Sequence, residues 1–320
     1  MNTNSITRAQ AGALLFGAAA VIANPLCLSA QSTDALRVLA FPSENTAEPF
    51  FAKDMGFFAK ARLDANVTPS STDSATVAAV LGGSADIGYS SVGTIASAHA
   101  KGLPITVIAP ASEYAVPETR GLAAVFVPAN STVRSAKDLN GKTFAVPGLG
   151  AIAYVGARDW MDKNGGDSST VKFVEIPYPA ETDLLNSGRF DAAFITEPFV
   201  GGAKKVGRLL DYGYTSIAKQ FTIGTWFTTR QWATDHPDIV RNYAAVMRQT
   251  ATWANKNHDQ SGVIFAKYAK IDPQTLAGLT RSHYGERIDT QLMQPIIDSF
   301  ARYIGFNAFP ASELIFNGKS

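Results

Sequence analysis

The order of apolar and amphipathic segments restricts the fold of this chain more than any other feature. Short apolar runs that predict strands lie at residues 36–41, 86–89, 105–109, 143–146, 172–176 and 191–195. Between them, helical patterns lie at 50–58, 72–81, 92–100, 151–164 and 180–185. After Trp226 helical patterns prevail, at 237–255, 263–268, 273–280 and 289–304. This alternation predicts an α/β fold with mainly parallel sheets flanked by helices.

One turn pattern occurs twice. Gly83-Ser84-Ala85-Asp86 ends an apolar helix and begins a strand, and Gly188-Arg189-Phe190-Asp191 does the same 105 residues later. That interval is much longer than a solenoid repeat of about 20–50 residues. Turns of this kind are also common in α/β proteins in general. We interpret this repeated turn pattern as an indication of two lobes built on the same α/β plan.

The first thirty residues have the pattern of a secretory signal peptide. Arg8 precedes a thirteen-residue apolar run from Ala11 to Ala23, and small residues follow at Ser29 and Ala30. The run is shorter than the ~20 residues of a membrane-spanning helix, although an N-terminal helix or anchor remains the alternative. Cleavage would also remove Cys27, the only cysteine. Export of a cysteine-free chain indicates a bacterial-type periplasm.

Composition and motifs exclude several function classes. With 28 Lys+Arg against 27 Asp+Glu, the chain lacks the basic footprint of a nucleic-acid-binding protein. The Gly88–Gly93 segment is one residue too long for a nucleophile elbow, and no glycine-rich stretch carries a Walker lysine. We therefore expect no catalytic residue, no metal site and no cofactor. The histidines are isolated in sequence, at His99, His236, His258 and His283.

The glycine-rich segment that follows the strand at 143–146 has two interpretations. Gly148-Leu149-Gly150-Ala151-Ile152-Ala153 matches G-x-G-x-x-A, and Glu175 follows near the end of the next strand, as in a dinucleotide-binding fingerprint. Alternatively, the glycines let the amides at a helix N-terminus approach a polar ligand group. We favour the second interpretation, because an exported chain does not meet a soluble nicotinamide and no hydride-transfer partner is visible.

Polar residues follow several of the predicted strands. They are Glu44 and Asn45, Ser90 and Ser91, and Glu197. Ligands of open α/β sheets bind beyond the carboxyl ends of the strands, so these loops would converge on one site. Trp226 would add an aromatic wall. The alternatives are helix capping for the serines, helix N-terminal charges for the acids and core packing for the tryptophan.

A series of motifs resembles a known family. Residues 47–58, Ala-Glu-Pro-Phe-Phe-Ala-Lys-Asp-Met-Gly-Phe-Phe, are similar to the "APxxxAxxxGFF" opening of nitrate/sulfonate/taurine-type periplasmic solute-binding proteins, relatives of the thiamine-pyrimidine-precursor binders. Further matches in the same order are Lys101–Pro104, Lys137–Val146, both Gly-x-x-Asp turns and Glu197-Pro198. The resemblance covers about residues 35–230.

This resemblance implies a two-lobe venus-flytrap receptor of an ABC importer, a type II periplasmic binding protein. One lobe would hold residues 31–115 and 216–320, the other 116–215, with crossings near 112–117 and 211–225. The implied partners are a small organic solute and the importer's permease, bound by a monomer that closes by hinge motion. The ligand residues carried over from the family pattern are Phe41, Glu44, Asn45, Ser90, Ser91, Gly148, Leu149, Gly150, Ala151, Tyr154 and Glu197.

One departure from the family pattern concerns the ligand. Sulfonate binders of this type resemble "GSsxhy" at the second-lobe cradle, whereas this chain has no hydroxyl between Gly148 and Tyr154. We therefore expect a larger and less charged ligand than sulfonate or nitrate. Glu44 and Glu197 would bind an amine or an N–H-bearing ring, on which Tyr154 and Trp226 would stack. The alternative is an enzyme on the same scaffold, similar to a pyrimidine-precursor synthase or dependent on a nicotinamide.

Overall fold

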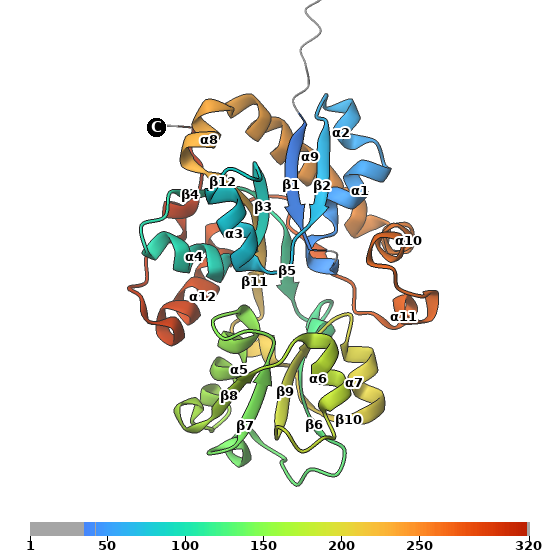
Figure 1. Cartoon of the computed structure of the whole chain (residues 1–320), viewed down its shortest axis with the longest axis vertical. Helices are drawn as coiled ribbons and strands as arrows, with labels where there is room; N and C mark the ends of the chain where they lie inside the picture. Colours follow the sequence, from blue (N-terminus) through green and yellow to red (C-terminus); the bar gives the residue numbers. More distant parts are fainter. Residues whose placement is uncertain (1–34, 42, 319–320) are drawn as a thin grey trace, which may run out of the picture. The chain divides into compact units, whose positions relative to one another are not determined.

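A computed structural model describes residues 35–41 and 43–318 (Figure 1). The predicted signal peptide, residues 1–30, lies outside this part. The first of two five-stranded sheets has the order β2 (Ala65–Pro69), β1 (Leu36–Ala40), β3 (Ile87–Ser91), β12 (Gly224–Thr229), β4 (Ile105–Pro110). The second has the order β8 (Lys172–Glu175), β7 (Thr143–Val146), β9 (Ala192–Thr196), β6 (Ala123–Pro128), β10 (Gly207–Asp211).

The two sheets share one plan. In each sheet four strands run in one direction, and one strand, β12 or β6, is antiparallel to both of its neighbours. When the four parallel strands of each sheet are numbered along the chain, their order across the sheet is second, first, third, fourth. The antiparallel strand lies between the third and the fourth. The predicted α/β fold with mainly parallel sheets is therefore confirmed.

The repeated turn begins the third strand of each sheet. Gly83 and Gly188 have φ angles of +71° and +75°, which glycine adopts without the strain of a side chain. The Asp86 carboxylate accepts a 2.8 Å hydrogen bond from the Arg37 amide, and the Asp191 carboxylate accepts one of 2.9 Å from the Thr143 amide. The aspartate thus ties the third strand to the start of the first in both sheets.

Helices cover both faces of each sheet. On the first sheet, α3 (Asp73–Leu81), α4 (Val92–Ala100) and α12 (Thr290–Phe300) share one buried cluster, and α1 (Glu48–Asp54), α2 (Phe57–Lys60) and α9 (Pro237–Lys256) share another. On the second sheet, α5 (Ile152–Lys163) packs against Phe144 and Val146, whereas α7 (Val200–Val206), which contacts α6 (Tyr178–Leu184), packs on the face of Ala145. The other C-terminal helices are α8 (Arg230–Asp235), α10 (His258–Ala269) and α11 (Pro273–Gly278).

Local signals placed many of these elements correctly. The predicted bounds of α4 and β7 agree with the structure, and Thr72 caps α3 by accepting a 3.1 Å hydrogen bond from the Ala75 amide. The helix expected at 50–58 is instead two helices, because Gly56 adopts a φ of +68° between them. Within the described residues, no helix has the length and apolar character needed to cross a membrane.

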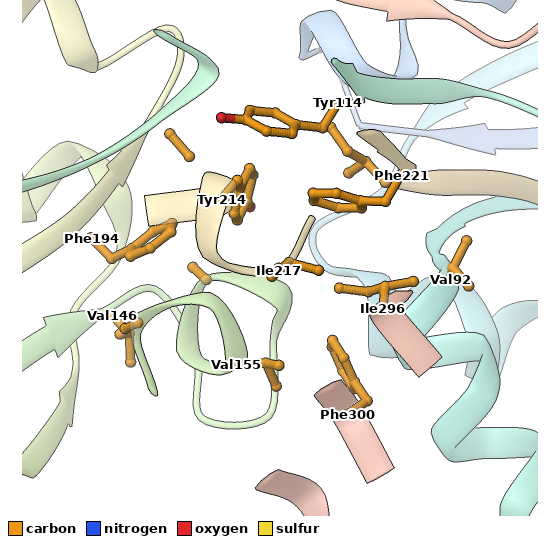
Figure 2. Close-up of a cluster of buried hydrophobic side chains, with 14 of the residues drawn as sticks. Val92, Tyr114, Val146, Val155, Phe194, Tyr214, Ile217, Phe221, Ile296 and Phe300 are labelled. Atoms are coloured by element: carbon orange, nitrogen blue, oxygen red, sulfur yellow. The ribbon is translucent and has the colours of Figure 1, made fainter. Parts of the chain in front are cut away.

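A third, small sheet carries the chain between the other two. It consists of β11 (Gln220–Thr222), β5 (Ser112–Ala115) and β13 (His283–Tyr284), all antiparallel. Strand β5 leads from β4 towards β6, and β11 leads from β10 to β12. One buried cluster extends across this region from Val92 through Phe221, Ile296 and Tyr214 to Phe194 (Figure 2). The two large sheets therefore share a continuous apolar core beside the crossing strands.

Candidate functional site

Buried polar atoms without a hydrogen-bond partner gather near the carboxyl ends of strands in both large sheets. Such atoms are costly to bury, so each indicates a group that a ligand or water would satisfy. Six of the nine found among the described residues lie on β3, on β12 opposite it, after β9, or in the helix after β8. They are Ser90 Oγ, Thr225 Oγ1, Glu197 Oε2, Thr182 Oγ1 and both carboxyl oxygens of Glu181.

Glu44 lies in a 3-10 turn, Glu44–Thr46, after β1 and is 2% exposed. Its Oε1 accepts a 2.7 Å hydrogen bond from Nε of Arg281, and its Oε2 accepts one of 3.2 Å from the Ser282 amide. Burial raises the pKa of Glu44, and the nearby Arg281 charge opposes that rise. Both oxygens of Glu44 are thus engaged within the protein, and the arginine neutralises its charge.

Glu197 follows β9 and has one free oxygen. Its Oε1 accepts a 2.9 Å hydrogen bond from the Thr280 amide, whereas Oε2 is buried without a partner. Burial raises the pKa of Glu197 to about 7. Hydrogen bonding by Thr280 and the charge of Lys204 oppose this rise, and the charge of Glu44 adds to it. The predicted acids therefore lie close enough to interact, and Glu197 offers a hydrogen-bond acceptor.

One short segment, Leu279–Tyr284, contacts both acids, and we name it the strap. Besides the contacts of Thr280, Arg281 and Ser282 with the acids, the Ser282 hydroxyl donates to Oδ1 of Asn45 over 3.0 Å. The hydroxyl of Tyr284 donates to the Glu44 carbonyl over 2.6 Å. Sequence analysis missed the strap, because it matches no motif and lies more than 230 residues from Glu44.

The two serines after β3 have different environments. The Ser91 hydroxyl caps α4 by accepting a 3.2 Å hydrogen bond from the Thr94 amide. Ser90 is fully buried, and its hydroxyl makes no hydrogen bond of ordinary geometry, although its interaction with Asp73 at the start of α3 opposes the rise that burial causes in the pKa of that acid. The Asp73 carboxylate accepts a 2.9 Å hydrogen bond from the Ser91 amide, and burial raises its pKa. Ser90 and Asp73 are therefore better candidates for ligand contacts than Ser91.

The glycine-rich segment joins β7 to α5 as its spacing predicts. Gly150 has a φ of +88°, and Ala151 is the N-cap of α5 without a side chain that could cap it. Leu149, between Gly148 and Gly150, is 56% exposed. A Cβ on Gly148 would stand 3.7 Å from Oε1 of Glu175, so the segment and the end of β8 are neighbours. The backbone at this helix start is open to a polar group.

Tyr154 is occupied by contacts within the protein. Nη1 of Arg158 donates a 3.1 Å hydrogen bond to its hydroxyl, and the ring of Phe173 lies edge-on with 5.0 Å between centroids. The Arg158 guanidinium also lies 4.9 Å from the ring of Tyr303, whose hydroxyl donates to Asp162 over 2.9 Å. Tyr154 therefore belongs to a contact between α5 and the C-terminal π-helical turn, Ala301–Gly305.

The prediction that Trp226 forms an aromatic wall is wrong. Trp226 is 0% exposed in the centre of the first sheet, between Tyr89 and Tyr243, at centroid distances of 5.6 and 5.9 Å. Its indole donates a 2.9 Å hydrogen bond to Oε2 of Glu48. Because β12 is a central strand with helices on both faces, this side chain points into the core. Phe41, by contrast, is 48% exposed directly after β1.

The fold defines the architectural class. Two mostly parallel sheets flanked by helices match the fold of periplasmic binding proteins. Residues 43–261 match the family model described as NMT1/THI5 like, and the chain belongs to this family. Among the described residues, no group of three or more His, Cys, Asp or Glu could hold a metal ion.

Solved structures with the same fold include three periplasmic or import-system components. The aliphatic sulphonate binding protein SsuA of Escherichia coli is 16% identical, with a TM-score of 0.72 over 88% of this chain and 97% of that chain. A Staphylococcus aureus ligand-binding component of an ABC-type import system, with zinc bound, is 13% identical, with a TM-score of 0.75 over 88% and 96%. The nitrate-binding protein NrtA of Synechocystis is 14% identical, with a TM-score of 0.68 over 87% and 83%. No curated protein matched the sequence.

Proposed function

We propose that this protein is an extracytoplasmic receptor that captures a small organic solute and delivers it to an ABC import permease without covalent chemistry. Residues 31–115 with 216–320 would form one lobe and 116–215 the other, with β5 and β11 at the crossing points. The similar structures include a ligand-binding component of an import system and two periplasmic binding proteins, which supports this role and a periplasmic location for a chain with the predicted signal peptide.

The observation that carries the proposal is the set of unpartnered polar atoms near strand ends of both sheets. Ser90 and Thr225 lie on the first sheet, and Glu197 follows β9 of the second. A solute held between the lobes would satisfy hydroxyls from one and a carboxylate from the other. Its binding would then favour the conformation that brings the lobes together.

The site's chemistry favours a solute that donates hydrogen bonds. The unpartnered set near the strand ends contains carboxylates and hydroxyls and no cation. Arg281 is committed to Glu44, the His258 carbonyl and the Ser261 hydroxyl. An oxyanion such as sulfonate or nitrate would meet the buried Glu197 carboxylate, whose charge the nearby Lys204 offsets only in part, and this contact is unfavourable. An amine or an N–H-bearing ring would instead donate to its free oxygen.

A second candidate is an enzyme on the same scaffold. The observation that favours it is the arrangement of Gly148, Gly150 and Glu175, which links β7, α5 and β8 in the order of a dinucleotide-binding unit. NAD bound in this way would lie at the start of α5 and would depend on Glu175. The two candidates therefore predict sensitivity to different glutamates.

A thermal-shift screen of residues 31–320 tests the proposal. The panel contains cytosine, primary amines, flavins, aromatic acids, taurine, ethanesulfonate, nitrate and NAD. A solute at a thousand times its Kd adds about 4 kcal/mol, which is a shift of about 8 °C at roughly 2 °C per kcal/mol. We expect an N–H donor to raise the melting temperature. Glu197→Gln should abolish this shift, because the glutamine amide has one acceptor oxygen fewer and presents N–H groups in its place. Glu175→Gln is the matched control and leaves the shift unchanged.

Other outcomes contradict the proposal. A shift with ethanesulfonate or nitrate would overturn the assignment of the solute class. A shift with NAD that Glu175→Gln abolishes, or a ligand recovered chemically altered, would favour the enzyme. Mass spectrometry of the released ligand separates an intact solute from a product.

A further inference from the structure

The strap joins the first lobe to Glu197, whose carboxylate has one oxygen bonded to the Thr280 amide and one oxygen without a partner. We propose that Thr280 is a latch that couples solute binding to lobe closure, with one oxygen of Glu197 holding the Thr280 amide and the other receiving the solute. This inference rests on the proposed function. Thr280 is a positioning residue in this mechanism, because it acts on the solute through Glu197.

The strap is held unequally at its two ends. Ser282 and Tyr284 are fixed to the first lobe, where Asn255 exchanges two 2.9 Å hydrogen bonds with the backbone of Tyr284 and β13 pairs with β5. Towards the second lobe, the hydrogen bond recorded from the strap is that from the Thr280 amide to Glu197. The Thr280 end is therefore the part that would separate when the lobes open.

A glycine on the second lobe makes this approach possible. A Cβ on Gly121, which lies in the 3-10 turn Arg120–Leu122 before β6, would stand 2.2 Å from Oγ1 and 3.2 Å from Cβ of Thr280. A larger residue at position 121 would thus collide with the side chain of Thr280. Gly121 has no left-handed φ that would otherwise require glycine, so the close approach of Thr280 explains its place.

Space on the outer side of the strap allows it to move. A recess of about 310 Å³ is lined by Leu279 and Arg281 of the strap, by His258, Asp259 and Gly262 of α10, and by Leu276 and Ala277. Leu279 and Arg281 therefore border open volume, and Arg281 also contacts Glu44. A displaced strap end would enter this volume, and Leu279 would change its packing against the buried cluster that contains Phe51 and Phe265.

The carboxylate provides the coupling. A donor from the solute at Oε2 stabilises the ionised form of Glu197, and an ionised carboxylate binds an N–H group about twice as strongly as a neutral one. The Thr280 hydrogen bond to Oε1 is thereby strengthened when the solute is bound. The same linkage acts in reverse, so a held latch raises the affinity for the solute.

The matched variants Gly121→Ala and Gly201→Ala test the latch in residues 31–320. Alanine at 121 would collide with Thr280, whereas alanine at 201 in α7 would meet nothing within 4 Å. Hydrogen exchange of the Thr280 amide is measured without any ligand. We expect Gly121→Ala and Glu197→Ala to accelerate this exchange at least about tenfold, because each removes a hydrogen bond to a carboxylate. Gly201→Ala leaves it unchanged. Equal exchange in all four proteins would overturn the latch, whatever the fate of the proposed function.

A disulfide gives the second readout. Residues 31–320 contain no cysteine, so Gly121→Cys/Thr280→Cys introduces the only pair, at a Cβ separation near the 3.5–4.5 Å of natural disulfides. We expect the pair to oxidise readily and cytosine, as the probe, to accelerate the reaction when it binds. Failure to oxidise would overturn the contact. Binding of cytosine, seen by its thermal shift, without acceleration would overturn the coupling.

Discussion

Glu181 makes the stability of this protein depend on pH in a way that one substitution would remove. The residue is 0% exposed in α6, and neither of its carboxyl oxygens has a hydrogen-bond partner. Burial raises its pKa from an ordinary 4.5 to about 9. Between these two values the folded chain keeps a proton that the unfolded chain has lost. The free energy of unfolding therefore falls as the pH rises through this window.

The magnitude follows from the width of the window. Each pH unit within the window lowers the free energy of unfolding by about 1.4 kcal/mol. Glu181 therefore lowers it by about 4 kcal/mol between pH 5 and pH 8. Glu181→Gln has the same shape and does not ionise. We expect the free energy of unfolding of the variant, relative to the parent, to rise by about that amount over the same range. The amide has its own burial cost, which shifts the whole curve and leaves the pH dependence intact.

The assay is urea unfolding of residues 31–320 at four or five pH values. Asp183→Asn, an exposed acid of the same helix, is the matched control and retains the parent's pH dependence. Other buried acids, including Glu197 and Glu113, whose pKa values burial raises to about 7, contribute equally to all three proteins and cancel. Parallel curves for the parent and Glu181→Gln would refute the reasoning, because they would show that Glu181 ionises freely in the folded state.

Three further substitutions test other features by urea unfolding. Thr72→Ala removes the cap of α3 and should cost about 1 kcal/mol, and no loss would mean that the start of α3 is held by packing alone. Trp226→Phe leaves the buried carboxyl of Glu48 without its indole donor and should cost about 3 kcal/mol or more, whereas a cost below 1 kcal/mol would show that water replaces the donor. Tyr303→Phe deletes the hydroxyl that donates to Asp162 and should cost about 1 kcal/mol; an unchanged midpoint would indicate a contact too exposed to stabilise the chain.

Much of the fold could be predicted because its signals are local. The helix at 92–100 and the strand at 143–146 carry their own caps and patterns, and the repeated Gly-x-x-Asp turn has a local cause in the positive φ of its glycine. Four strands of the two large sheets were missed: β2, β10 and the two antiparallel strands, β6 and β12. Strands β6 and β12 each follow a crossing strand with no intervening α-helix, so the alternation of strand and helix is absent there.

The candidate site could be predicted only from its strand-end side. Glu44 and Glu197 follow apolar strands, and the rule that loops at carboxyl ends converge was enough to select both. The strap that joins them could not be foreseen, because the contact of Arg281 with Glu44 spans 237 residues and leaves no periodic pattern. Trp226 was misplaced for a related reason. Near a segment that joins the two sheets, an aromatic residue that lines a cleft has the same sequence pattern as one that packs in the core.

The connections of the two antiparallel strands also determine the order in which the two sheets can be completed during folding. The second sheet draws all its strands from residues 123–211, so a growing or translocating chain can complete it early. The first sheet must wait for β12, which is synthesised only after the whole second sheet. Until then β3 and β4 lack the strand that lies between them. The first four strands of this sheet thus emerge with open edges, and their protection from aggregation depends on how quickly residues 224–229 follow.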